Sequence, residues 1–205
     1  MEYDEKIGFG SNYEKFILSN IFVQLINKLK IKSVLEYPAN QLMGDHQEIF
    51  KTTNMIINPP KADLVWNFTE FERSRDSQLM IEEMMKRSNK YLFIITGNKM
   101  NLGVCLHRLW HFLIFKKWDH GLIRNMDYKK VKKELDKFEN LKLIKKNAFD
   151  IPWFILDVYE AGKILKFFVP RKRGAKKIKP TVFERYPFFI KKFMSHHFYI
   201  LAEKT

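Results

Sequence analysis

The sequence has almost no cysteine and no apolar run long enough to cross a membrane. Cys105 is the only cysteine among the 205 residues, so no internal disulfide can form. No apolar run reaches the roughly 18 to 20 residues that a membrane-spanning helix needs. The opening stretch, Met-Glu-Tyr-Asp-Glu, is acidic and has no apolar signal core. These absences predict a cytoplasmic protein without a membrane span.

Acidic residues are also few relative to basic ones. Asp and Glu number 23 against 37 Lys and Arg, which gives a formal net charge of +14. This balance favours attraction to nucleic acid, acidic lipid surfaces or phosphorylated substrates. A solvated, lysine-rich surface explains it equally well.

The remaining composition is that of a globular domain. Hydrophobic residues make up 46% of the chain and aromatic residues 15%, with 19 phenylalanines. That supply of apolar side chains is enough for a substantial core. The length fits one domain, which we interpret as residues 1–205.

Short apolar runs alternate with amphipathic helical patterns along the chain. Strands are predicted at 31–37, 62–68, 91–96, 141–144 and 198–202. Helices are predicted after a capping box at Ser11, around Leu79–Met85, at Val104–Phe115 and after the N-cap Asp127. The run 91–96 is almost continuously apolar, as in a central parallel strand covered on both faces. The pattern predicts an α/β fold with a mainly parallel sheet and helices on both faces.

Four segments carry a resemblance to a known family through their order in the chain. An acidic residue, Glu36, ends the first strand and precedes a turn that reaches Gly44; the other segments are Asp63–Phe68, Asn89–Thr96 and His196–Ala202. In this order they resemble the first, fourth, fifth and last, antiparallel, strands of the class I S-adenosylmethionine (SAM)-dependent methyltransferases. The resemblance implies a Rossmann-like methyltransferase fold with SAM as cofactor. It also implies the cofactor-binding residues, which are Glu36, Pro38, Asn40, Gly44, Asn67 and Phe68.

Two departures from the family pattern concern the cofactor site. The turn after Glu36 has a single glycine, Gly44, which comes late in the turn. Pro38 and Asn40 stand where small flexible residues usually let the backbone approach the cofactor. Residues 45–62 are also too few for two strands with their helices, which need roughly 35 to 45 residues. The fold is therefore expected to lack one or two strand–helix units. The second strand of the family supplies a carboxylate for the ribose, and neither Asp45 nor Glu48 is well placed for that role.

Two functions are compatible with this pattern. One is a SAM-dependent methyltransferase of unknown substrate, and the other is a catalytically inactive methyltransferase-like binding or scaffold protein. A basic cluster would serve a nucleic-acid or protein partner in the second case. Its members are Arg171, Lys172, Arg173, Lys176, Lys177 and Lys179.

Other conspicuous residues have plainer interpretations. Asn58-Pro59-Pro60-Lys61 is similar to the Asn-Pro-Pro-aromatic signature of amino-group methyltransferases, but it lacks the ring and is expected to be a turn. His107 and His111 share a helix face without a third ligand nearby, so no metal site is expected. His196 and His197 would point to opposite faces of an extended strand.

Overall fold

The computed structural model describes residues 12–38, 50, 55–113, 115, 117, 121–149 and 186–205. Its strands are β1 (Ser33–Glu36), β2 (Ile56–Ile57), β3 (Ala62–Phe68), β4 (Ser88–Gly97), β5 (Leu141–Phe149) and β6 (His197–Lys204). Its helices are α1 (Asn12–Leu29), α2 (Glu70–Arg73), α3 (Ser77–Arg87), α4 (Leu102–Leu113), α5 (Tyr128–Leu135) and α7 (Phe188–Met194), with a 3-10 turn, η2, at Ile123–Asn125.

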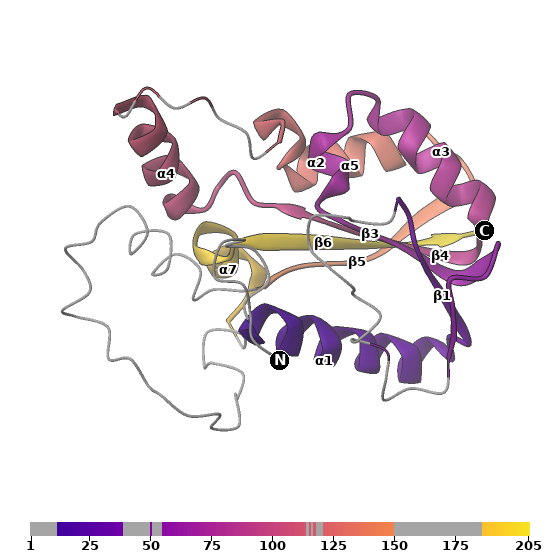
Figure 1. Ribbon diagram of the computed structural model, residues 1–205. Coiled ribbons are helices and arrows are strands. Elements are labelled where there is room, and N and C mark those ends of the chain that lie inside the picture. Colours follow the sequence, from indigo (N-terminus) through magenta and orange to yellow (C-terminus); the bar gives the residue numbers. More distant parts are fainter. Residues whose placement is uncertain are drawn as a thin grey trace.

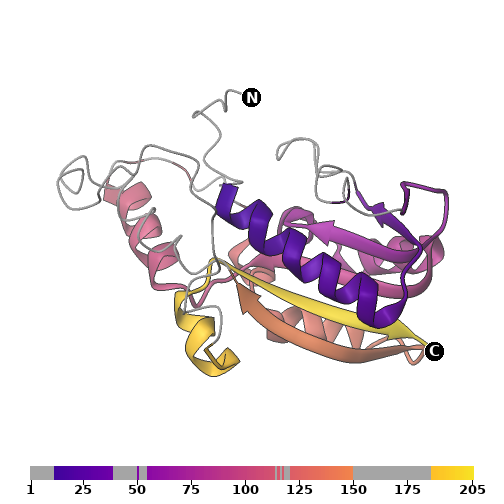
Figure 2. The same ribbon diagram turned by 90° about the horizontal axis from the view of Figure 1, so that it is seen from below.

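The strands form one sheet in the order β2-β1-β3-β4-β6-β5. β2, β1, β3 and β4 run parallel, and β6 pairs antiparallel with both β4 and β5. Helix α1 covers one face, while α2, α3 and α5 cover the other (Figure 1; Figure 2 shows α1 crossing in front of the strands). The predicted α/β class, the parallel central strands and the covering of both faces are confirmed.

Alternate residues of the central strands enter two separate cores. Trp66 and Phe93 pack under α1, where they contact Phe22. Their neighbours Val65 and Ile94 pack against α2, α3 and α5 on the other face. Because successive side chains of a strand point to opposite faces, two covered faces require the continuous apolar runs that the sequence shows.

The predicted elements agree with the structure at most positions. β3 has the predicted bounds, and Asp127 caps α5 by accepting a hydrogen bond from the Lys129 N–H at 2.9 Å. The strand predicted at 141–144 is wrong in length, because β5 continues to Phe149. Ser11 lies outside the described residues, and the single-domain interpretation of 1–205 stays a prediction.

The shortened segment before β3 contains a small strand that the sequence did not predict. β2 pairs with β1 through Ser33–Ile56 and Val34–Ile57. The last pair joins Ile57 to Val34, so β2 stops two residues before the end of β1 at Glu36. Residues 58–61 then lead directly into β3. The turn interpretation of Asn58–Lys61 is confirmed, and Asn58 takes a left-handed φ of 54° in it. Of the two strands expected between the first and fourth family equivalents, the described part of the chain holds this one.

Candidate functional site

The carboxyl ends of β1, β3 and β4 meet at one edge of the sheet. The Tyr37 N–H donates to the Trp66 carbonyl at 2.8 Å, and the Thr69 N–H donates to the Ile95 carbonyl at 2.9 Å. The ladders therefore continue past the last residue of β1 and of β3. In doubly wound α/β folds, ligands bind just outside this edge.

Glu36 and Glu70 place two carboxylates at this edge. Glu36 ends β1 and is half-buried, and its N–H donates to the Asn58 side-chain oxygen at 3.3 Å. Glu70 begins α2, and burial raises the pKa of its carboxyl, the Arg73 guanidinium lowers it, and the charge of Glu36 raises it further. The Arg73 Nε lies 3.9 Å from the Glu70 Oε1, at the outer limit of an ion pair. Two acidic side chains close enough to influence each other would favour a cationic ligand group at this edge.

Asn67, a predicted cofactor contact, uses its side chain to connect neighbouring elements. Its amide nitrogen donates to the Tyr37 carbonyl at 3.0 Å and lies 3.8 Å from the Met80 sulfur. Its amide oxygen accepts from the Phe71 N–H at 3.0 Å. Asn67 is completely buried, so these bonds join the end of β1 to the start of α2.

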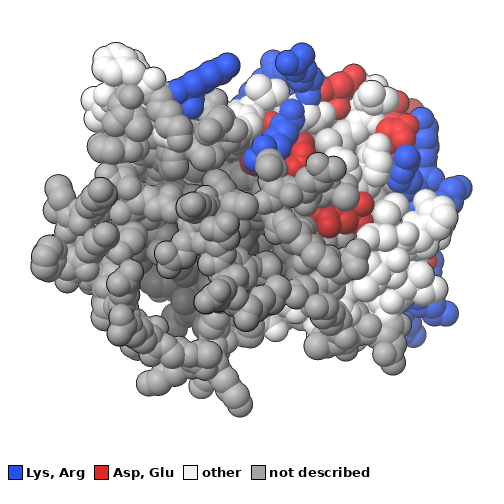
Figure 3. Space-filling model, in the orientation of Figure 1, with Lys and Arg blue, Asp and Glu red and all other residues white. Residues whose placement is uncertain are grey.

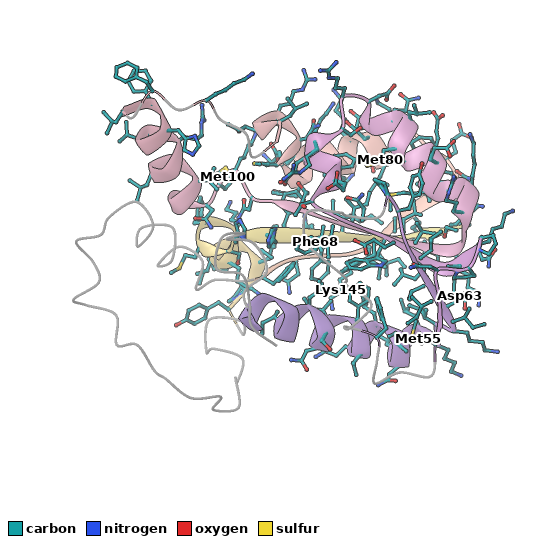
Figure 4. All side chains as sticks on the ribbon, in the orientation of Figure 1. Met55, Asp63, Phe68, Met80, Met100 and Lys145 are labelled. Atoms are coloured by element: carbon teal, nitrogen blue, oxygen red, sulfur yellow. The ribbon has the colours of Figure 1, made fainter. Side chains whose placement is uncertain are left out.

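Of the other predicted site residues, the structure describes Phe68 and Pro38. Phe68 is buried in the core under α1, with its ring centroid 5.3 Å from that of His197. In Figure 4, Phe68 lies at the far end of β3 from Asp63, while Met80 lies among the helices above the sheet. Pro38 is half-buried and follows a cis peptide bond with Tyr37. Asn40 and Gly44 lie outside the described residues.

Thr69 turns the chain sharply where β3 ends. Its φ is 59° and its ψ −12°, the left-handed region that a β-branched residue rarely adopts. Its N–H donates to the Ile95 carbonyl, and its own carbonyl accepts from the Glu72 N–H at 3.2 Å. This strained turn brings Glu70 and Glu72 back onto the carboxyl edge of the sheet.

Glu72 forms a buried polar cluster with the end of β4, which the sequence analysis missed. One carboxylate oxygen, Oε2, accepts from the Gly97 N–H at 2.6 Å and from the Thr96 hydroxyl at 3.2 Å. Burial raises the pKa of Glu72 to about 7, against the opposing effects of the Gly97 N–H, the charge of His197, the Thr96 hydroxyl and Arg73. The available signal in the sequence was Gly97, a glycine directly after the longest apolar strand, where another group can approach the backbone closely.

Gly97 is required by the position of the Glu72 carboxylate. A Cβ added at Gly97 would lie 2.8 Å from Glu72 Oε2 and 3.4 Å from Met126 Cγ. We expect Gly97→Ala to lower the free energy of unfolding by about 1–3 kcal/mol, because the buried carboxylate would have to move off its hydrogen bonds to the Gly97 N–H and the Thr96 hydroxyl. Urea unfolding would measure this loss. In a Glu72→Ala background the same substitution should cost much less, and an unchanged cost would contradict the proposed contact.

His196 and His197 lie close together, which corrects the prediction that they point apart. Their ring centroids are 3.9 Å apart with planes at 51°. β6 begins at His197, so His196 precedes the strand and the alternation of an extended backbone does not apply to it. In the described ranges, no three His, Cys, Asp or Glu side chains come together as a potential metal site.

Charge of both signs covers the described part of the face in Figure 3, where red acidic side chains alternate with blue basic ones. The basic cluster predicted as a partner surface, from Arg171 to Lys179, lies outside the described residues. Among the helices that the structure describes, none combines the length and apolarity needed to cross a membrane.

Comparisons with known proteins found similar ones by structure alone. No protein-family model matches the chain, and no curated protein matches it by sequence. Magnesium protoporphyrin IX methyltransferase (ChlM) from Synechocystis PCC 6803 with bound SAH superposes with a TM-score of 0.52 at 8% identity, over 94% of this chain and 84% of that chain. The plantazolicin methyltransferase BpumL, in complex with a triazolic desmethylPZN analog and SAH, gives a TM-score of 0.52 at 12% identity, over 98% of this chain and 90% of that chain.

The chain has a class I methyltransferase-like fold. In this fold β1, β3 and β4 take the places predicted for the first, fourth and fifth strands, and β6 is the terminal antiparallel strand. β2 stands beside β1, where the family has its second strand. The carboxyl edge with Glu36 and Glu70 is the edge at which the family resemblance places the cofactor.

Proposed function

We propose that this protein is a SAM-dependent methyltransferase that binds its cofactor at the carboxyl edge of β1, β3 and β4. One observation carries the proposal: Glu36 and Glu70 place two neighbouring carboxylates at that edge, Glu36 at the end of β1 and Glu70 at the turn after β3. SAM carries two cationic groups, the α-ammonium and the sulfonium. A pair of carboxylates that repel each other is stabilised when a cation binds between or beside them.

The residues fit one part of this cofactor better than another. Glu36 and Glu70 would hold its cationic groups, and when bound it supplies an electrophilic methyl group. At the end of β2, where the family has a carboxylate for the ribose, the chain has Asn58, whose side-chain oxygen already accepts from the Glu36 N–H. No carboxylate of the described residues 55–62 replaces it. Methyl transfer depends mainly on positioning, so the function does not require a dedicated base.

We therefore expect weak cofactor binding. A calorimetric titration with SAM should give a dissociation constant no tighter than about 0.1 mM, or roughly −5.5 kcal/mol. A low-micromolar constant would contradict the argument from Asn58 while supporting the function. No detectable heat at millimolar SAM would contradict the function itself.

Glu36→Gln tests the site, because it removes the charge and keeps the shape of the side chain. SAM affinity should fall at least about tenfold, since the remaining charge of Glu70 is partly compensated by Arg73. The melting temperature of the free protein should change little. Glu139→Gln, the same change on an exposed turn, is the matched control and should leave SAM binding unaltered. Equal affinity of the Glu36 variant and the native protein would contradict this site.

A second candidate function is that of an inactive binding or scaffold protein with the same fold. The two-residue β2 and the side-chain bonds of Asn67 favour it, because both leave fewer groups for a cofactor. A folded protein that shows no heat with SAM, but binds nucleic acid with strong salt dependence, would favour this candidate. Loss of that binding on neutralising Arg171, Lys172 and Arg173 would locate the surface.

A further inference from the structure

Helix α4 presents an apolar stripe to solvent instead of to the core. Among the α4 residues whose burial the structure describes, Gly103, Val104 and His111 are buried, and they lie toward one side of the helix. The opposite side carries exposed apolar residues at helical spacing, with Phe112 at 75% exposure, and Phe115 just after the helix is 97% exposed. The full set, which we call the α4 stripe, is Leu106, Leu109, Phe112, Leu113 and Phe115.

Helix α7, from a distant part of the chain, also exposes apolar residues. Phe189 is 63% exposed and Phe193 is also exposed. The Asn98 amide, just before α4, donates to the carbonyls of Lys192 and Ser195 at 2.6 and 2.9 Å. Both helices lie off the carboxyl end of the sheet, and α4 projects away from it (Figures 1 and 2). The start of α4 and the end of α7 are thus held beside each other, and each helix exposes phenylalanine.

The segments that carry these helices are mostly basic, although the Lys99 amine, just before α4, lies 2.5 Å from the Asp127 carboxylate. Residues 98–126 contain a single acidic residue, Asp119, against Lys99, Arg108, Lys116, Lys117 and Arg124, and residues 186–197 contain no acidic residue. Arg108 and Lys117 are exposed, and the Lys192 amine lies 4.6 Å from the centroid of the Phe193 ring. In Figure 3 the described atoms over α4, at the upper left, are white and blue without red.

We propose that α4 and α7 form a docking surface for an anionic lipid bilayer. Clustered exposed apolar side chains on a folded domain mark an interaction site. Leucine and phenylalanine beside lysine and arginine, without acids, is the pattern of helices that lie in the plane of a membrane interface. Basic side chains there extend to the headgroups while the rings enter the acyl boundary. The proposal is independent of SAM binding and goes beyond the proposed function.

Charge decides between a bilayer and other occupants of this surface. A second copy of the chain would bring the same basic residues against themselves, since a two-fold contact pairs a surface with its own copy. A nucleic acid would satisfy the basic residues but leave the exposed leucines and phenylalanines of the α4 stripe in water. An anionic bilayer satisfies the charge and the apolar groups together.

The test is co-sedimentation of the purified full chain with lipid vesicles. Mixed phosphatidylcholine–phosphatidylserine vesicles should bind the protein at least about tenfold more tightly than pure phosphatidylcholine vesicles, and added salt should weaken that binding. Phe112→Glu should reduce binding to the mixed vesicles by at least about tenfold, because it places an acidic group in the apolar stripe. Arg108→Glu should reduce binding to the mixed vesicles without creating binding to the neutral ones.

Leu79→Glu on α3 is the matched control. Leu79 is 51% exposed and belongs to α3, which lies in the helix layer above the sheet, away from α4 and α7 (Figure 1). This variant should therefore bind vesicles like the native protein. All three glutamate variants replace exposed side chains, and unchanged melting temperatures would verify folding. The proposal is overturned by absence of binding, by equal binding to both vesicle types, or by equal loss in the Leu79 variant. It is also overturned if Phe112→Glu abolishes self-association or nucleic-acid binding and leaves vesicle binding intact.

Discussion

Glu72→Gln should raise the free energy of unfolding by about 3 kcal/mol at pH 8 and leave it nearly unchanged at pH 4. The folded-state pKa of Glu72 is raised from 4.5 to about 7, mainly by burial. Between these two values the folded chain keeps a proton that the unfolded chain has released, so native stability falls as pH rises through this window. Glutamine keeps an oxygen that can accept from the Gly97 N–H, and it does not ionise.

Urea unfolding of the variant and the native protein from pH 4 to pH 8 would measure this difference. Other carboxylates titrate in the same range, so the quantity of interest is the difference between the two curves. The Glu139→Gln protein should follow the native curve within about 0.5 kcal/mol, because its side chain is exposed. A Glu72→Gln difference that does not grow with pH would show that Glu72 is not a buried acid with a raised pKa.

Asn67→Ala should lower the free energy of unfolding by about 2–5 kcal/mol. The substitution leaves the buried Phe71 N–H without its acceptor and the Tyr37 carbonyl without its donor. Each loss costs the desolvation of a polar group that water reaches poorly. Chemical denaturation would measure the change.

Asn89→Ala is the control for this prediction, since Asn89 is exposed on the same sheet. It should change stability by no more than about 0.5 kcal/mol. An Asn67→Ala protein of native stability with reduced SAM affinity would contradict the structural role and favour the cofactor contact implied by the family resemblance.

The sequence predicted best those strands that are covered on both faces. Ala62–Phe68 was predicted with the bounds of β3, because nearly every residue of that strand is buried. β5 was predicted too short for the opposite reason. It is an edge strand with Lys142, Lys145 and Lys146 on its exposed positions, and its pairing with β6 shifts between Leu143 and Lys145. Long side chains on a solvated face interrupt the apolar signal without interrupting the strand.

The candidate site could be predicted only where strand ends mark it. Glu36 follows an apolar strand directly, so its place at the carboxyl edge could be inferred from the chain. Glu72 sits between other charged residues in a short helix and looks like any solvated glutamate. Its burial arises from Gly97 and Gly121, both of which lie close to it although they come 25 and 49 residues later. The sequence marks Gly97 as a position where a group can approach the backbone, but it does not say which group does so.

By itself, the sequence determined the α/β class, the parallel central strands and the acidic end of β1, because hydrophobic periodicity and strand-end residues act over short distances along the chain. Tertiary structure alone decided that β2 pairs with β1 and that Glu72 is buried with a raised pKa. It also decided that the Asn67 side chain is hydrogen-bonded to the backbone of Tyr37 and Phe71. It also decided that the apolar residues of α4 face outward instead of inward. A helical stripe in the sequence fixes which residues share a face, but what that face meets depends on segments far away in the chain.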